Sequence, residues 1–373
     1  MVIYADNAAT TQLDTDAFEA MKPFLLENYA NPSGAYSYSK KAKQAIKAAR
    51  KMIAECINAE PEQIYFTSGG TESDNWAIKG FALSDYDYKA VITSQIEHHA
   101  ILNSCYDIER LKHPVAYLPV DCKGVVATDT LNRYISDRIG LVSVMTTNNE
   151  IGTIEPIKEL AQIAHSHGAL FHTDAVQAVG HIPIDVKVLG IDMLSASAHK
   201  FNGPKGIGFL YCKERVLQPF HNGGSQEFGM RAGTENVPAI VGMTVALRKN
   251  IIEMEQNAKH LRRLSEELLS ILEASNVPFI LNGHPTNRLP GNINLSIKGK
   301  SGEGLMHMLD LKGICVSTGS ACDSHNQQVS HVIQAIGVPE DYCEGTIRIT
   351  LGKHNTEEEV KAIAETLIKL SRI

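Results

Sequence analysis

The feature that most constrains this fold is the alternation of short apolar, β-branched runs with helical stretches between about residues 60 and 215. Strands that alternate with helices are typical of βαβ units, which build a mostly parallel sheet. Such sheets bind ligands just beyond the carboxyl ends of their strands. Helices are expected over 72–83, 100–111 and 157–167. The expected strands cover 64–67, 90–94, 115–119, 141–146, 170–173, 193–195 and 208–211.

A long helical stretch at about 237–274 separates this region from the rest of the chain. Short strands and helices alternate again over 275–373, which predicts a second, smaller α+β domain. A chain of 373 residues is long enough for two or three domains.

Net charge and cysteine usage exclude several classes of protein. The chain carries a formal charge of −7, which argues against a general binder of nucleic acid or of an anionic membrane. No apolar run is long enough to span a membrane, and the first residues show no signal peptide. Seven cysteines, an odd number without a CxxC pair, disfavour a disulfide framework and a structural zinc site. We therefore expect a protein of the cytoplasm with no membrane segment.

A glycine-containing segment follows the expected strand at 64–67 and reads Thr67-Ser-Gly-Gly-Thr-Glu-Ser-Asp74. Small residues let the backbone approach a ligand, and the free N–H groups at a helix N-terminus bind anions. Thr71 followed by Asp74 fits a capping box. The segment is neither a Walker motif nor GxGxxG, and an ordinary strand-to-helix turn is the alternative interpretation.

An acid and an amine follow two later strands. Asp174 stands where the strand at 170–173 should end, although alone it would be read as a turn or N-cap residue. Lys200 follows the run Ser-Ala-Ser-Ala-His and precedes a Gly-Pro turn, so we expect it to be partly buried. A desolvated amine has a lowered pKa and forms Schiff bases. A lysine, an aspartate and a phosphate-binding turn are together what pyridoxal phosphate requires.

Two further residues follow strands of the same expected sheet. His98 comes after the strand at 90–94, and an imidazole there could stack on a pyridine ring. Asn149 lies in the segment Asn148-Asn-Glu-Ile-Gly152 and could donate to a ring hydroxyl. A loop residue with satisfied hydrogen bonds is the alternative for each.

Cys322 and Arg348 are the candidates in the C-terminal part. Cys322 lies in a Gly/Ser-rich loop away from any apolar periodicity, so we expect an accessible thiol, whereas Cys56 suits a buried core. Arg348 sits inside the alternating strand 346–350, where it could capture a carboxylate in bidentate fashion. A surface arginine is the commoner alternative.

Together these segments resemble the cysteine desulfurases, in the class V aminotransferase group of pyridoxal-phosphate enzymes of fold type I. The resemblance runs nearly end to end, and it is the joint match that is specific. The matching segments are Tyr4-Ala-Asp-Asn-Ala-Ala-Thr10, Asn31-Pro-Ser, 66–75, Glu97-His98, 148–152, 174–177, 197–200, 223–227, 231–236, 319–322 and Arg348.

The resemblance implies an α/β fold with a mostly parallel, seven-stranded sheet flanked by helices, and a smaller α+β domain. It implies a large cofactor-binding domain over 14–255. The small domain would combine 1–13 with 256–373 and carry the catalytic cysteine loop.

The resemblance also implies a role for each site residue. Lys200 would carry pyridoxal 5′-phosphate as an imine, Asp174 would pair with the pyridinium nitrogen, and His98 would stack on the ring and serve in acid/base steps. The remaining cofactor-binding residues would be Asn149 and Gln177 near the ring hydroxyl, and Gly70, Thr71, Ser197, His199 and a second subunit's Thr234 around the phosphate. Arg348 and Asn31 would bind the substrate carboxylate, and Cys322 would be the sulfur nucleophile.

Two segments depart from the family pattern. Residues 34–41 replace the usual His and Gly-Arg pair that follow Asn31-Pro-Ser, and Val329 replaces the usual proline before Ser330-His331. These departures concern the substrate-side edge and the motion of the cysteine loop, and they do not touch the cofactor residues.

The activity implied is removal of sulfur from L-cysteine to give L-alanine and a persulfide on Cys322. The protein would be a homodimer that passes sulfur to an acceptor such as an iron–sulfur scaffold or a tRNA-thiolation enzyme, without binding nucleic acid itself. One alternative is a class V aminotransferase or selenocysteine lyase with a structural Cys322. Another is a non-catalytic, cysteine-rich scaffold or regulator.

Overall fold

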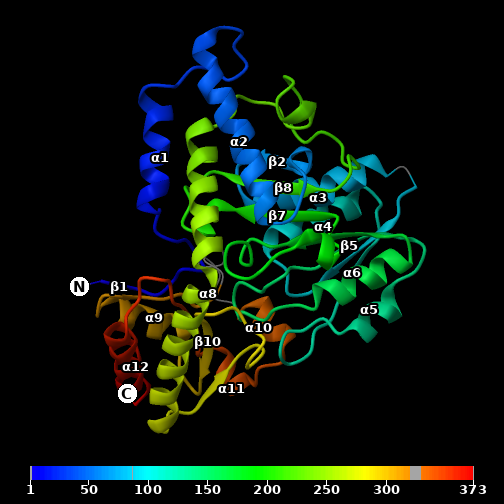
Figure 1. The fold of residues 1–373 in the computed structure, drawn as a ribbon. Coiled ribbons are helices and arrows are strands. Elements are labelled where there is room, and N and C mark those ends of the chain that lie inside the picture. Colours follow the sequence, from blue (N-terminus) through cyan, green and yellow to red (C-terminus); the bar gives the residue numbers. More distant parts are fainter. Residues whose placement is uncertain (1, 86, 320–328, 373) are drawn as a thin grey trace.

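The computed structural model describes residues 2–85, 87–319 and 329–372. Cys322 therefore lies outside the described residues. The described part forms two lobes joined by one long helix (Figure 1). None of the helices within these residues is both long and apolar enough to cross a bilayer.

A seven-stranded sheet forms the centre of the larger lobe. The five strands from β7 to β4 run parallel, while β8 is antiparallel to both of its neighbours. The mostly parallel sheet predicted from the alternation is thus confirmed. In spatial order the strands are β2 (Ile64–Thr67), β8 (Gly208–Cys212), β7 (Met193–Ser197), β6 (Leu170–Asp174), β5 (Ile139–Ser143), β3 (Ala90–Ser94) and β4 (Val115–Leu118).

The predicted bounds are wrong at β5, which begins two residues early and ends at Ser143. Its start pairs with Ala90 across a register irregularity beside Gly140, which the apolar pattern does not reveal. The residues after Ser143 still hydrogen-bond to β6 through Val144 and Thr146, so the chain leaves the sheet gradually.

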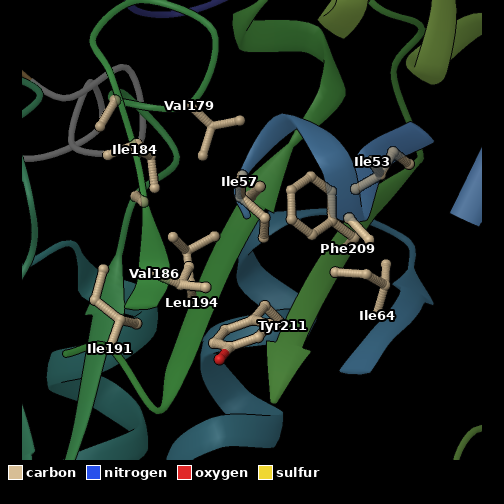
Figure 2. Close-up of a cluster of buried hydrophobic side chains, with 14 of the residues drawn as sticks. Ile53, Ile57, Ile64, Val179, Ile184, Val186, Ile191, Leu194, Phe209 and Tyr211 are labelled. Carbon is tan, nitrogen blue, oxygen red and sulfur yellow. The ribbon is translucent and has the colours of Figure 1, made fainter. Parts of the chain in front are cut away.

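Helices cover both faces of the sheet because its strands are buried on both sides. Figure 2 shows Ile53 and Ile57 packed against Ile64, Phe209 and Leu194 of the sheet. The helices before the long connector are α1 (Thr15–Leu26), α2 (Lys40–Cys56), α3 (Gly70–Ser84), α4 (His99–Arg110), α5 (Thr128–Tyr134), α6 (Ile157–Ser166) and α7 (Val186–Leu189).

The connector α8 (Val237–Ala274) has 38 residues and contributes to both hydrophobic cores. Ile240, Met243 and Leu247 belong to the core of the large sheet. Further along, Leu264 and Leu268 belong to the core of the smaller lobe. One rigid element thus holds the two lobes against each other.

Two small sheets form the smaller lobe. One has the order β12 (Thr346–Thr350), β10 (Asn292–Ile297) and β9 (Phe279–Leu281), and the other pairs β1 (Ile3–Tyr4) with β11 (Ile314–Cys315). The N-terminal strand therefore lies in the lobe built from the C-terminal residues. The helices here are α9 (Gly302–Asp310), α10 (His331–Ala335), α11 (Glu340–Cys343) and α12 (Glu357–Ser371).

A buried ion pair covers β2, the edge strand of the large sheet. Arg50 donates to Glu227 through both terminal nitrogens, at 2.6 and 2.8 Å, and also to the carbonyl of Ile64. The second Glu227 oxygen accepts from the Phe66 amide at 2.8 Å. Side chains thus complete the hydrogen bonds that a further strand would make, which protects an edge from pairing with another chain.

Replacing Glu227 with alanine should lower the free energy of unfolding by about 3 kcal/mol, because it leaves Arg50 and the Phe66 amide buried without their acceptor. Urea unfolding followed by circular dichroism measures this change. The matched control is Glu19→Ala, which breaks the exposed Lys22–Glu19 pair and should cost less than about 1 kcal/mol. Equal losses in the two variants would contradict the role given to the buried pair.

A second buried carboxyl, Glu97, ties the ends of β3 and β5 together. It is fully buried, and its Oε1 accepts from the Ser94 hydroxyl at 2.7 Å and from the Met145 amide at 2.9 Å. Burial raises the pKa of Glu97 to about 8, against the hydrogen bonds from Ser94 and Met145. The folded protein therefore keeps a proton that the unfolded chain releases near pH 4.5.

This difference predicts that Glu97 makes the protein less stable as the pH rises from about 5 to about 8. Glu97→Gln keeps the shape and an acceptor but cannot ionise. Relative to the parent, the variant should therefore gain up to about 1.4 kcal/mol of stability per pH unit across this window. Unfolding of both proteins at pH 5, 6, 7 and 8 measures the gain. A constant difference across the four pH values would contradict the assigned protonation.

Candidate active site

Strand ends bring the candidate residues to one edge of the large sheet. Because β2 and β7 are both antiparallel to β8, they point the same way as each other and as the parallel strands beyond. The carboxyl ends of β2, β3, β5, β6 and β7 therefore face one side. The candidate residues at or just after these ends are Gly70, His98, Asn149, Asp174 and Ser197.

Lys200 ends a single 3-10 turn (Ala198–Lys200) directly after β7. Its Nζ donates to the carbonyl of Ala8 at 2.5 Å and to that of Ala9 at 2.9 Å. The Ala8 carbonyl also accepts from Gln177 Nε2 at 3.0 Å. The lysine amine and the Gln177 amide therefore meet on one turn of the N-terminal segment.

Asp174 is the last residue of β6 and is almost fully buried. Its Oδ1 accepts from the Val176 amide at 2.9 Å. Burial raises the pKa of Asp174 to about 6, while that amide and the Lys200 charge act to lower it. A cation or a protonated ring nitrogen against this carboxyl would favour its ionised form.

The Gly69-Gly70 turn opens α3 beside the end of β7. A Cβ on Gly70 would lie 2.5 Å from Val176 Cγ2, and one on Gly69 would lie 3.4 Å from Ser197 Oγ. Gly69 also has φ +151°, which side chains rarely adopt. Only glycine leaves this helix N-terminus open, with Thr71 exposed in its first turn.

The capping box predicted at Thr71 and Asp74 is wrong. The helix begins at Gly70 with Gly69 as its N-cap, and Glu72 accepts from the Ser68 amide at 2.7 Å. Asp74 instead lies on the buried face of α3, 3.9 Å from His172 of β6. The prediction missed this because two glycines allow the helix to start without a side-chain cap.

Two histidines in the site have defined surroundings. His98 is the N-cap of α4, and its Nδ1 accepts from the Ala100 amide at 3.1 Å, so a neutral ring carries its proton on Nε2. His199 Nδ1 lies 3.1 Å from the Thr10 hydroxyl. Burial, helped by the charges of Lys200 and Lys205, lowers the pKa of His199 to about 4, so this ring is neutral at pH 7.

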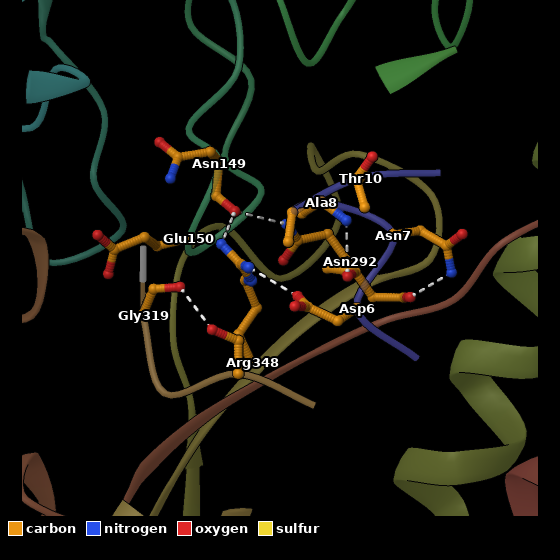
Figure 3. Close-up of polar contacts among 12 residues, drawn as sticks. Asp6, Asn7, Ala8, Thr10, Asn149, Glu150, Asn292, Gly319 and Arg348 are labelled. Atoms are coloured by element: carbon orange, nitrogen blue, oxygen red, sulfur yellow. Dashed lines mark hydrogen bonds and ion pairs between the residues drawn. The ribbon is translucent and has the colours of Figure 1, made fainter. Parts of the chain in front are cut away.

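Arg348 faces this edge from β12 of the smaller lobe (Figure 3). It is buried, so the alternative of a surface arginine is wrong. One terminal nitrogen lies 2.7 Å from Asp6 Oδ1, and the other donates to the carbonyl of Asn149 at 3.2 Å. The side-chain amide of Asn149 points away from the guanidinium.

Three candidate residues are not joined to this group by contacts between described residues. Asn31 is exposed, and its side chain accepts from the Ser33 amide rather than contacting Arg348. Thr234 is exposed on the segment before α8. Cys322 lies outside the described residues; Ser317, which is described, exchanges two backbone hydrogen bonds with Arg348.

Sequence reasoning gave no role to Asp6 or to the Ala8 and Ala9 carbonyls. Asp6 through Ala9 lie inside the resembling segment at 4–10, so the signal was present. Backbone carbonyls have no side-chain signature, and the contact between Asp6 and Arg348 spans 342 residues of sequence.

The donors present fit pyridoxal phosphate. The glycine turn leaves room for a phosphate at a helix N-terminus, a buried carboxyl is available for a ring nitrogen, and the Lys200 charge acts on that same carboxyl. Among the described residues, no group of three or more histidine, cysteine or acidic side chains is arranged to hold a metal.

Comparison with known proteins assigns the family. Residues 3–363 match the profile of a family described as aminotransferase class-V. Cysteine desulfurase IscS of Methanosarcina thermophila is 49% identical over 368 residues, which cover 98% of this chain and 91% of that protein. The protein of the same name from Dictyoglomus turgidum is 47% identical, with 99% and 94% covered.

Solved structures agree with this assignment. A NifS-like protein superposes with a TM-score of 0.93 at 36% identity, covering 99% of both chains. A structure described as SspA in complex with cysteine gives a TM-score of 0.83 at 34% identity and covers 95% of this chain and 100% of that one. From its sequence and its fold alike, the chain belongs to the class-V aminotransferase family and, within it, to the cysteine desulfurases.

Proposed function

We propose that this protein removes sulfur from L-cysteine with the help of pyridoxal 5′-phosphate, yielding L-alanine and a persulfide on Cys322. The observation that carries the proposal is that one turn, Asp6–Ala9, contacts both the Lys200 amine and the Arg348 guanidinium. A substrate amine at the first group would therefore have its carboxylate near the second. The family and a relative described in complex with cysteine support this substrate.

Each residue has a task that its surroundings suit. When bound, pyridoxal phosphate supplies an aldehyde for amines and a ring that accepts the electron pair left by a departing proton. Lys200 would hold the cofactor and then take the substrate's Cα proton. Asp174 would hold a proton on the ring nitrogen, and His98 would stack on the ring and assist proton transfer at its Nε2.

The other polar residues would fix positions. Gln177 and Asn149 would approach the ring hydroxyl, and Arg348, with Asn31, would bind the substrate carboxylate. The phosphate would be held by Gly70, Thr71, Ser197 and His199, with Thr234 supplied by the second subunit of a homodimer.

Sulfur transfer would use the Cys322 thiolate. A bond forms between its sulfur and the substrate sulfur while the carbon–sulfur bond of the substrate breaks. The electron pair of that bond stays with carbon, which is protonated to give L-alanine. A thiolate is required because the thiol is a poor nucleophile.

The sulfur would then pass to an acceptor protein, such as an iron–sulfur scaffold or a tRNA-thiolation enzyme, in the cytoplasm. We also propose the domain division at 14–255 against 1–13 with 256–373. It is supported by the separate hydrophobic cores and by the sharing of α8 between them.

Replacing Cys322 with alanine tests the sulfur step. The variant should form L-alanine from L-cysteine at least about 100-fold more slowly than the parent, because no nucleophile remains to take the sulfur. Amino acid analysis measures the alanine, and mass spectrometry of the protein detects the persulfide. Cys122→Ala, at an exposed cysteine, is the matched control and should leave both unchanged.

Two results would contradict the proposal. Alanine and sulfane sulfur formed at the parent rate by Cys322→Ala would favour a lyase or aminotransferase with a structural Cys322. A purified protein that stays colourless with pyridoxal phosphate would favour a non-catalytic scaffold.

Gly70→Ala tests the phosphate site without measuring activity. The new methyl group would meet Val176 Cγ2 at 2.5 Å and crowd the helix N-terminus. We expect the dissociation constant for pyridoxal phosphate to rise about tenfold or more, as measured by equilibrium dialysis. Gly304→Ala is the control, since its nearest neighbour lies at an ordinary 3.5 Å. An unchanged constant in Gly70→Ala would place the phosphate elsewhere.

A further inference from the structure

The backbone of the N-terminal segment fixes where the Asp6 side chain can lie. Asn7 donates to the carbonyl of Thr350 at 3.1 Å, and Ala5 donates to that of Cys315 at 2.9 Å. These bonds hold Asp6 against β12, two residues beyond Arg348. On the other side, Thr11 donates to the carbonyl of His199 at 2.9 Å, so the segment is also held by the larger lobe.

A tight turn then connects Asp6 to the lysine contacts. The Ala9 amide donates to the Asp6 carbonyl at 3.0 Å, and the Tyr4 hydroxyl lies within hydrogen-bond distance of the carbonyls of Asp6 and Thr10. The Asp6 carboxyl and the two carbonyls that hold Lys200 therefore belong to one braced unit. A shift of Asp6 along β12 would move both groups.

The guanidinium of Arg348 has a donor to spare. Its side chain is only 2% exposed, and its two terminal nitrogens are bonded to Asp6 and to the Asn149 carbonyl. The Nε–H is buried and has no hydrogen-bond partner among the described residues. A buried donor without an acceptor destabilises the protein. A bound molecule that supplies an acceptor at this position would remove that cost.

We propose that Asp6 is a positioning residue, which holds Arg348 by one terminal nitrogen so that Nε–H stays directed at the carboxylate of an amino-acid substrate. The proposal rests on the function proposed above and specifies how its carboxylate site is built. The Asp6 charge offsets that of Arg348, so the site selects a carboxylate through the direction of its donors more than through net charge. Asp6 itself does not touch the substrate.

The test compares ligands with and without a carboxylate on the holoenzyme. L-alanine carries the carboxylate, whereas cysteamine is cysteine without it, and binding of each is followed by the change in cofactor absorbance. In Asp6→Ala the dissociation constant of L-alanine and the KM for L-cysteine should rise about tenfold, because Arg348 is free to turn away. The dissociation constant of cysteamine should change less than about twofold.

Three further variants separate positioning from general damage. Asp6→Asn keeps an acceptor for Arg348 and should recover most of the affinity for L-alanine. On an Arg348→Ala background, Asp6→Ala should add less than about a twofold change, because Asp6 acts only through Arg348. The matched control is Asp16→Ala. Asp16 lies on the neighbouring helix α1, where it is an exposed ion-pair partner of Lys249, and its loss should leave the dissociation constants of both ligands unchanged.

The proposal would be overturned if Asp6→Ala weakened the binding of L-alanine and of cysteamine equally. It would also be overturned if Asp6→Ala weakened L-alanine binding as much on the Arg348→Ala background as in the parent. Either result would show that Asp6 only maintains the fold. Failure of the parent to form alanine from L-cysteine would instead overturn the proposed function. The binding comparison would still be readable in that case, so the two failures are distinguishable.

Discussion

The arrangement of the site depends on the backbone hydrogen bonds of residues 3–11, which are divided between two lobes. Ile3, Ala5 and Asn7 donate to carbonyls of the smaller lobe, and Thr11 donates to the larger one. The side chains that meet this segment come from different lobes, Lys200 from the turn after β7 and Arg348 from β12. Together with α8 and the hydrogen bond from Arg348 to the Asn149 carbonyl, this segment sets the distance between the two cations. The functional side chains of the two lobes are thus positioned partly by the backbone hydrogen bonds of this segment.

Much of the larger lobe could be predicted because its signals are local. The runs at β3, which is β-branched, and at β8, which is aromatic and aliphatic, are short and apolar, and the structure places strands there within a residue or so. Asp174 and Lys200 were found because a charged residue at the end of an apolar strand, or shortly after a run of small residues, stands out in the sequence. Parallel topology then brings such residues to one edge without further information.

Contacts between distant residues could not be predicted in this way. Nothing in the pattern around Arg348 indicates Asp6 as its partner, and the sharing of Glu227 between Arg50 and the Phe66 amide is equally invisible. The start of α3 was misjudged because helix starts at glycine have no polar cap to reveal them. The role of Cys322 stays a prediction from the sequence.

The pairing of β1 with β11 also has a consequence for biosynthesis. Ile3 pairs with Ile314, and Asn7 bonds to Thr350, so these contacts cannot form until the chain as far as Thr350 has left the ribosome. The large sheet is complete by Cys212 and can assemble while translation continues, in the usual domain-wise order. During that interval the nascent chain can hold a finished sheet, with Ala8 and Ala9 against Lys200, before residues 3–7 have met the smaller lobe. The Arg348 side of the site would then be completed late, when residues 3–7 dock against residues 314–350.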